Sequence, residues 1–205
     1  MAEFKGIKLR IREMSELVFG MWQDTFRTFM KHDEDLIPPI LAVENKVNEL
    51  EKEITTDLIA LGRACASDKE RANISHYVDV VGDLELIGDY CKDILERVQI
   101  KIQEGLLFSD EAVKEYEVLY HKTEDALGEI VSVLKKDNYK MVQEVLRNQE
   151  HIDTLVDGYR QRHNQRLIQG TCTPIACNMF LNMLDFTAAI YYHTKKIAKS
   201  LMKIE

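Results

Sequence analysis

Hydrophobic residues recur along this chain at spacings of three and four positions, which is the period of an α-helix buried on one side. The first such stretch runs roughly from Phe4 to His32. The second follows an acidic turn that begins at Asp33, and Pro38 and Pro39 lie where a first helical turn tolerates proline. The pattern predicts a chain that is helical nearly throughout.

Capping residues mark where the later helices begin. Ser67 precedes Glu70 by three positions, which is the spacing of a capping box. Ser109 is a typical N-cap, and Thr173 is an N-cap followed by a proline at the first helical position. The last four helices are therefore expected to begin at Ser67, Ser109, about Asn138 and Thr173, the third ending near Gly105 and the fifth at Gly170.

The six predicted helices form two triplets that can be laid on each other. The stretch from Val47 to Leu50 falls on Ile152 to Leu155, and Ile94 falls on Ile197. Long helices joined by short turns pack antiparallel. The expected fold is therefore all-α, with two tandem three-helix bundles related by an internal pseudo-repeat. The two expected bundles are residues 1–105 and 106–205.

The net negative charge of the chain argues against two classes of binding partner. The 205 residues carry a formal charge of −8, and the sequence pI is near 5.3. Nucleic acids and anionic lipid surfaces both attract basic faces, so neither is an expected partner. The N-terminus has no apolar signal core, and we expect a cytoplasmic protein. The most apolar segment, Thr171 to Tyr192, contains Asp185 and is expected to be a central bundle helix and not a membrane span.

Neither the cysteines nor the histidines have the spacing of a known site. Cys65, Cys91, Cys172 and Cys177 fit neither a Cys-x-x-Cys zinc pair nor a disulfide framework, so reduced thiols are expected. No histidine has an acidic residue three positions before it, which excludes the Glu-x-x-His pairs of ferritin-like di-iron enzymes. Phosphate loops, nucleophile elbows and zinc-protease motifs are also absent from the sequence. We therefore predict that the protein is not an enzyme.

Two acidic residues mark the most informative segment of the chain. Glu85 and Asp89 are four positions apart, so they lie one above the other on a helix face beside an apolar stripe. The run Leu-Glu-Leu-Ile-Gly-Asp-Tyr at residues 84–90, followed by Ile94, resembles the Glu-Arg-Ile-Gly-Asp-His segment of PhoU proteins. PhoU proteins are helical regulators of bacterial phosphate uptake.

This resemblance implies a metal site. PhoU proteins carry Glu/Asp-x-x-x-Asp pairs on two helices of each bundle, where clusters of iron or zinc-like ions bind. The matching residues in the first half are Glu44, Asn48, Glu85 and Asp89, of which Asn48 is neutral and a poorer ligand. The alternative is that Glu85 and Asp89 only keep a helix face solvated. In the second half the matching positions hold Gln149, Asp153, Ala188 and Tyr192, so that site is expected to be degenerate.

A second resemblance lies in residues 159–174. The run Arg-x-x-His-x-x-Arg-Leu-x-x-Gly-x-Cys-x-Pro, which starts at Arg160, resembles the PhoU-like regions that follow the membrane part of bacterial sodium–phosphate cotransporters. Arg160, His163 and Arg166 fall on one helix face, which suits an acidic partner or an oxyanion. Alternatively, these basic residues only complement the negative end of a helix dipole.

The resemblance to PhoU implies a non-enzymatic regulator of phosphate uptake or phosphate-starvation signalling, which acts by contact with a phosphate transporter and/or a sensor histidine kinase. A metal-free interaction scaffold and a carboxylate-bundle metal-storage protein are the alternatives. Apolar residues spread around the sixth helix further predict a homodimer. These residues are Met179, Phe180, Met183, Phe186 and Tyr191.

Overall fold

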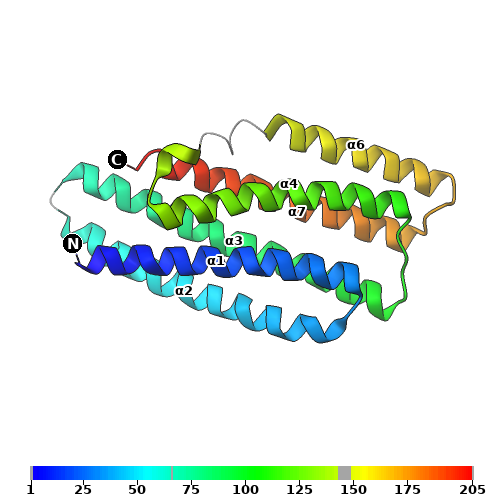
Figure 1. Ribbon diagram of the computed structural model, residues 1–205, viewed down its shortest axis with the longest axis horizontal. Helices are drawn as coiled ribbons and strands as arrows, with labels where there is room; N and C mark the ends of the chain where they lie inside the picture. The colour runs from blue at the N-terminus through cyan, green and yellow to red at the C-terminus, as the bar shows by residue number, and fades with distance from the viewer. Residues whose placement is uncertain (1, 66, 143–148, 205) are drawn as a thin grey trace.

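The computed structural model describes residues 2–65, 67–142 and 149–204, and every regular element in these ranges is helical (Figure 1). The all-α prediction is thereby confirmed. The elements are α1 (Ala2–Lys31), η1 (Glu34–Leu36), α2 (Ile37–Ala64), α3 (Asp68–Gln103), α4 (Asp110–Lys136), η2 (Tyr139–Val142), α6 (Gln149–Ile168) and α7 (Pro174–Leu201).

Three helices begin at the residues that the sequence indicated. The Ser67 side chain accepts a hydrogen bond from the backbone N–H of Glu70, and the Glu70 carboxylate accepts one from the backbone N–H of Ser67, which completes the capping box of α3. Ser109 and Thr173 cap α4 and α7 in the same way. Each cap satisfies a backbone donor that a helix start leaves unpaired, which fixes where the helix begins.

The predicted start of the fifth helix, near Asn138, is wrong. The preceding helix ends at Asp137, whose φ of 51° lies in the left-handed region, and residues 139–142 form a 3-10 turn. The helix itself begins at Gln149, and residues 143–148 lie outside the described part of the chain.

Polar contacts hold this turn against the first half of the molecule. The Asp137 carboxylate accepts hydrogen bonds from Lys8 Nζ at 2.7 Å and from Tyr139 Oη at 2.6 Å. The Tyr139 and Tyr77 hydroxyl oxygens are 2.8 Å apart and share a hydrogen bond. These contacts join residues from α1, α3 and η2, and helical periodicity does not reveal them.

The first helix triplet consists of α1, α2 and α3, and the second consists of α4, α6 and α7. The two triplets pack against each other. Figure 1 shows α2 and α6 on opposite sides of the molecule, with the other four helices between them. α1 contacts α4, and α3 contacts α7 more extensively than any other pair of elements. The second half therefore packs on the first through its most apolar helix.

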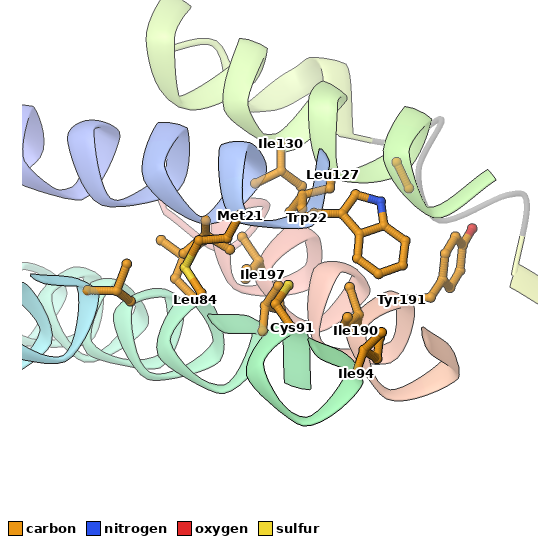
Figure 2. Close-up of a cluster of buried hydrophobic side chains, with 14 of the residues drawn as sticks. Met21, Trp22, Leu84, Cys91, Ile94, Leu127, Ile130, Ile190, Tyr191 and Ile197 are labelled. Carbon is orange, nitrogen blue, oxygen red and sulfur yellow. The ribbon is translucent and has the colours of Figure 1, made fainter. Parts of the chain in front are cut away.

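Side chains from four helices meet at the centre. In Figure 2, Leu84 and Cys91 of α3 lie beside Ile197 of α7, with Trp22 of α1 and Leu127 of α4 above them. All five are at most 1% exposed. Burying one such aliphatic side chain contributes about 1.5–3 kcal/mol, so this continuous core, which both triplets share, carries much of the stability.

The apolar residues that predicted a homodimer are largely buried within one chain. Phe180 and Met183 are fully buried, and Met179 and Tyr191 are no more than 5% exposed. Their burial is explained by the packing of α7 on its neighbours, so the homodimer remains a prediction without this support. None of the helices in the described part of the chain is both long and apolar enough to cross a membrane.

Candidate functional site

An acidic surface lies where α2 meets α3. Glu44 and Asn48 come from α2, and Glu85 and Asp89 come from α3, so the structure brings the four predicted residues to one helix pair. Gly88 lies between the two acidic residues of α3. A Cβ atom on Gly88 would meet Val47 Cγ1 of α2 at 3.4 Å, the near limit of ordinary van der Waals contact, so the two helices pack closely at this point.

This surface holds more negative charge than its surroundings neutralise. The pKa of Glu85 is raised by burial and then by the charges of Asp89, Glu51 and Glu44. The pKa of Asp89 is raised by burial and then by the charge of Glu44. A bound cation would favour the charged forms and relieve both effects.

One positive charge is already built into the acidic surface. Lys92 Nζ donates a hydrogen bond to Glu44 Oε1 at 3.0 Å, and Asn48 Nδ2 donates to the same oxygen at 2.9 Å. Glu44 is 2% exposed, whereas the side chain of Lys92 is 41% exposed. The hydrogen bond to Glu44 is the main reason that the pKa of Lys92 is raised.

The oxygen donors of the acidic surface are of the chemical type that hard or borderline metal ions prefer. Asn48 turns its amide nitrogen toward Glu44, which leaves its Oδ1 buried without a hydrogen-bond partner. Like the carboxylate oxygens of Glu44, Glu85 and Asp89, this oxygen is a ligand of the type that such cations prefer. Among the described residues, the three carboxylates do not form a group whose ligand atoms all lie within 4.8 Å of one another. Lys92 would compete with the metal for Glu44.

The corresponding positions of the second repeat do not form a similar surface. Asp153 is exposed, Tyr192 is 53% exposed, and Ala188 offers no ligand atom. The charge of Lys195 interacts with that of Asp153. The side chain of Gln149 lies outside the described residues. The expectation of a degenerate second site is consistent with this arrangement and stays a prediction.

The arginines of α6 are paired within the chain and do not present a free basic face. Arg162 Nε and Arg166 Nη2 each donate to Glu115 of α4 at 2.6 Å, one to each carboxylate oxygen. The side chains of Arg166 and Glu115 are only 14% and 11% exposed. Arg160 forms an ion pair with Asp185 of α7. These pairs dock α6 on the two other helices of its triplet.

A second buried polar contact joins the two halves. Asp83 of α3 is 2% exposed and accepts hydrogen bonds from His193 Nδ1 at 2.8 Å and Lys196 Nζ at 2.7 Å, both on α7. Helical spacing could not predict this contact, because it does not specify the register between two distant helices.

The structure also brings together a histidine and two cysteines that spacing left unconnected. His163 near the end of α6, Cys172 in the connection to α7 and Cys177 in the first turns of α7 have ligand atoms that all lie within 4.8 Å of one another. The spacing of the cysteines and histidines predicted no such site. The only sequence signal is that His163 and Cys172 both belong to the segment 159–174.

The fold and the acidic surface define a class of protein: two helical triplets in tandem, with a pair of carboxylates on one helix of the first triplet facing a carboxylate on the neighbouring helix. A family model that describes the PhoU domain matches residues 11–98, which span most of the first triplet and include all four residues of the acidic surface. Residues 11–98 therefore match a PhoU domain.

Solved structures extend the likeness to the whole chain. The crystal structure of PhoU from Pseudomonas aeruginosa superposes with a TM-score of 0.90 at 16% identity, covering 99% of this chain and 97% of that one. The phosphate transport system regulatory protein PhoU from Streptococcus pneumoniae superposes with a TM-score of 0.87 at 12% identity, covering 99% and 95%. At these identities the likeness shows a shared fold over both triplets. No protein with curated annotation matches the sequence.

Proposed function

We propose that this protein is a non-enzymatic regulator of phosphate uptake and phosphate-starvation signalling in the cytoplasm, and that it acts by contact with a phosphate transporter and/or a sensor histidine kinase. The observation that carries the proposal is the PhoU domain at residues 11–98 within a chain that has the PhoU fold throughout. One protein of this fold is described as a phosphate transport system regulatory protein.

One end of the molecule supports a role in protein contact. The connections α3–α4 and α6–α7 lie at the same end of the bundle (Figure 1). Leu107, Ile168 and Ile175, which belong to these connections or flank them, are 82%, 85% and 65% exposed. These three exposed apolar side chains lie at one end of the molecule, and exposed apolar surface is typical of interaction sites.

Deletion of the gene tests the proposed function. We expect higher phosphate accumulation, or expression of phosphate-starvation genes in phosphate-rich medium, and restoration by the wild-type gene. A Leu107→Glu/Ile175→Glu variant should fold and fail to restore regulation, whereas Ile59→Glu, at a 45% exposed position on α2, should restore it. Unchanged phosphate uptake and unchanged reporter expression in the deletion strain would contradict the proposal.

We also propose that Glu44, Asn48, Glu85 and Asp89 hold an iron or zinc-like ion. The raised pKa values of Glu85 and Asp89 and the unpartnered Asn48 oxygen support binding. The hydrogen bond between Lys92 and Glu44 favours the other candidate, a metal-free interaction scaffold, because it supplies a positive charge without an ion. Metal analysis of purified protein that carries Cys172→Ser and Cys177→Ser, with and without Glu85→Ala/Asp89→Ala, separates the two. A homodimer remains a prediction, and a monomer mass in light scattering over a broad concentration range would refute it.

A further inference from the structure

We propose that His163, Cys172 and Cys177 form a second metal site, for a thiophilic divalent cation such as Zn²⁺, at the turn between α6 and α7. This site is chemically distinct from the acidic surface, because two of its three ligands are sulfur atoms. It does not depend on a role in phosphate regulation.

The distances suit a tetrahedral ion. His163 Nε2 and Cys172 Sγ are 3.6 Å apart, and the three ligand atoms lie within 4.8 Å of one another. Zinc binds sulfur at about 2.3 Å and nitrogen at about 2.0–2.1 Å, so two such ligands at a tetrahedral angle are about 3.6 Å apart. The histidine and the first cysteine already have this separation.

Local structure places the three ligands with little freedom. Gly170, with a φ of 72°, reverses the chain at the end of α6. Thr173 then caps α7, which puts Cys172 just before the helix and Cys177 in its first turns. The His163 ring stacks on Phe180 of α7, with ring centroids 4.3 Å apart and planes at 20°. Ligands held on helix ends by packing are suited to a fixed coordination geometry.

Burial favours a bound ion and leaves it a path of entry. His163 is 1% exposed and Cys177 is 2% exposed, whereas Cys172 is half-buried. An ion can therefore enter past Cys172, and solvent can supply a fourth ligand on that side. Two thiolates would balance the charge of Zn²⁺, so the occupied site would be electrically neutral, as a buried site requires.

Protonation states set the chemistry of binding. A histidine binds a metal as the neutral imidazole, through a ring nitrogen that carries no proton. Each cysteine binds as a thiolate, so binding one ion to the reduced protein releases two protons.

Arg166 limits the affinity of the site. Its Nη2 atom lies 3.1 Å from His163 Nδ1. A guanidinium can only donate, so in the metal-free protein Nδ1 accepts this hydrogen bond and Nε2 carries the ring proton. A metal on Nε2 moves the proton to Nδ1, and the contact with Arg166 must open. Arg166 keeps its bond to Glu115 at 2.6 Å, so it stays anchored when the contact opens.

Cobalt titration of the full-length protein, reduced with a phosphine, tests the proposal. We expect one equivalent of Co²⁺ to produce a thiolate-to-cobalt charge-transfer band, and Zn²⁺ to displace it. Cys172→Ser and Cys177→Ser should each remove most of the band and weaken binding at least tenfold, as should His163→Gln. Circular dichroism shows whether each variant remains folded.

Two controls isolate the site. Cys65→Ser changes a half-buried cysteine outside this group and should leave the band unchanged. Glu85→Ala/Asp89→Ala should also leave it unchanged, because carboxylate ligands do not produce this band. The proposal is overturned if the reduced wild-type protein gives no band, or if folded Cys172→Ser protein binds as tightly as wild type. A reduced protein that binds no metal and instead joins Cys172 to Cys177 on oxidation would show a redox pair in place of a metal site.

Discussion

Lys92 donates a hydrogen bond to the buried carboxylate of Glu44 across 48 positions of sequence, within the acidic surface of α2 and α3. The register that places Ile94 on Ile197 also places Lys92 on Lys195, whose charge interacts with that of Asp153. Each triplet therefore has a lysine on its third helix that faces an acidic residue of its second helix. In the first half this lysine is in direct contact with a carboxylate that is a candidate metal ligand.

The two halves should differ in metal binding. Glu85→Ala/Asp89→Ala removes two of the three carboxylates of the acidic surface, so binding of iron or zinc-like ions there should be lost. Asp153→Ala should leave it unchanged, because a single carboxylate rarely holds a transition metal against water. Calorimetry on protein that also carries Cys172→Ser and Cys177→Ser reports this surface alone. Binding that survives the first change, or that depends on Asp153, would show that the assignment is wrong.

Lys92 should stabilise the fold while it weakens metal binding. Lys92→Met leaves the Glu44 carboxylate buried with only Asn48 as a hydrogen-bond donor, and we expect a loss of about 1–3 kcal/mol in the free energy of unfolding. Glu44→Gln/Lys92→Met should recover part of this loss, since no unpaired charge is then buried. Urea unfolding of Lys92→Met, Glu44→Gln and the double variant measures the coupling energy between Lys92 and Glu44. Purely additive losses would mean that the ion pair contributes nothing.

Stability should respond to pH in a direction set by Glu85 and Asp89. Their pKa values are raised in the folded protein, so folding favours the protonated forms, and their unfavourable contribution is present above the folded pKa values and fades as the pH falls through them. Glu85→Gln should therefore increase the free energy of unfolding at pH 7 by about 0.2–0.5 kcal/mol, the size of a like-charge pair one helical turn apart.

That gain should shrink as the pH is lowered, and metal binding at the acidic surface should weaken over the same range because protons compete for the carboxylates. Unfolding of chelator-treated protein at several pH values measures the gain in the free energy of unfolding. A gain that grows toward acidic pH would contradict the assigned direction of the shifts.

Glu115 should hold α6 in place. Glu115→Gln removes the charge that pairs with Arg162 and Arg166, and Arg166 remains largely buried. We expect a loss of about 1–3 kcal/mol, with faster hydrogen exchange confined to α6. Glu117→Gln changes an acidic side chain that is 45% exposed on the same helix and serves as the control. Equal rates of hydrogen exchange in α6 of the two variants would show that Glu115 does not hold this helix in place.

The contact between α3 and α7 should control global stability. Ile197→Ala creates a cavity where four helices meet (Figure 2), and the expected cost is about 2–5 kcal/mol. Ile59→Ala, at a 45% exposed position, should change the free energy of unfolding by less than about 0.5 kcal/mol. Probes in the two halves should report one transition, and separate transitions would show that the halves fold independently.

Helical period and capping residues predicted most of the architecture because both signals are local. Ser67, Ser109 and Thr173 begin their helices where the sequence indicated. The fifth helix was placed too early, since the left-handed Asp137 and the contacts of Tyr139 interrupt the helix through interactions with α1 and α3.

The chemistry of the sites was less accessible to sequence. Spacing placed Glu85 and Asp89 on one face, but it gave no sign of Lys92 on Glu44, because the register between two helices depends on packing. His163, Cys172 and Cys177 are separated by nine and five positions, which match no simple ligand pattern. Only the reversal at Gly170 and the stacking of His163 on Phe180 bring them together.

The interface between α3 and α7 joins the two triplets of one chain in the way that an interface joins the two subunits of a dimer. A fragment that ended at Gly105 would expose the stripe of α3 that α7 now covers, including Leu84 and Cys91. Such a fragment could bury this apolar stripe again by associating with a second copy of itself. Joining the two triplets in one chain therefore replaces an encounter between molecules with an intramolecular one. It also lets the halves differ: the acidic surface lies in the first, and the turn with His163, Cys172 and Cys177 lies in the second.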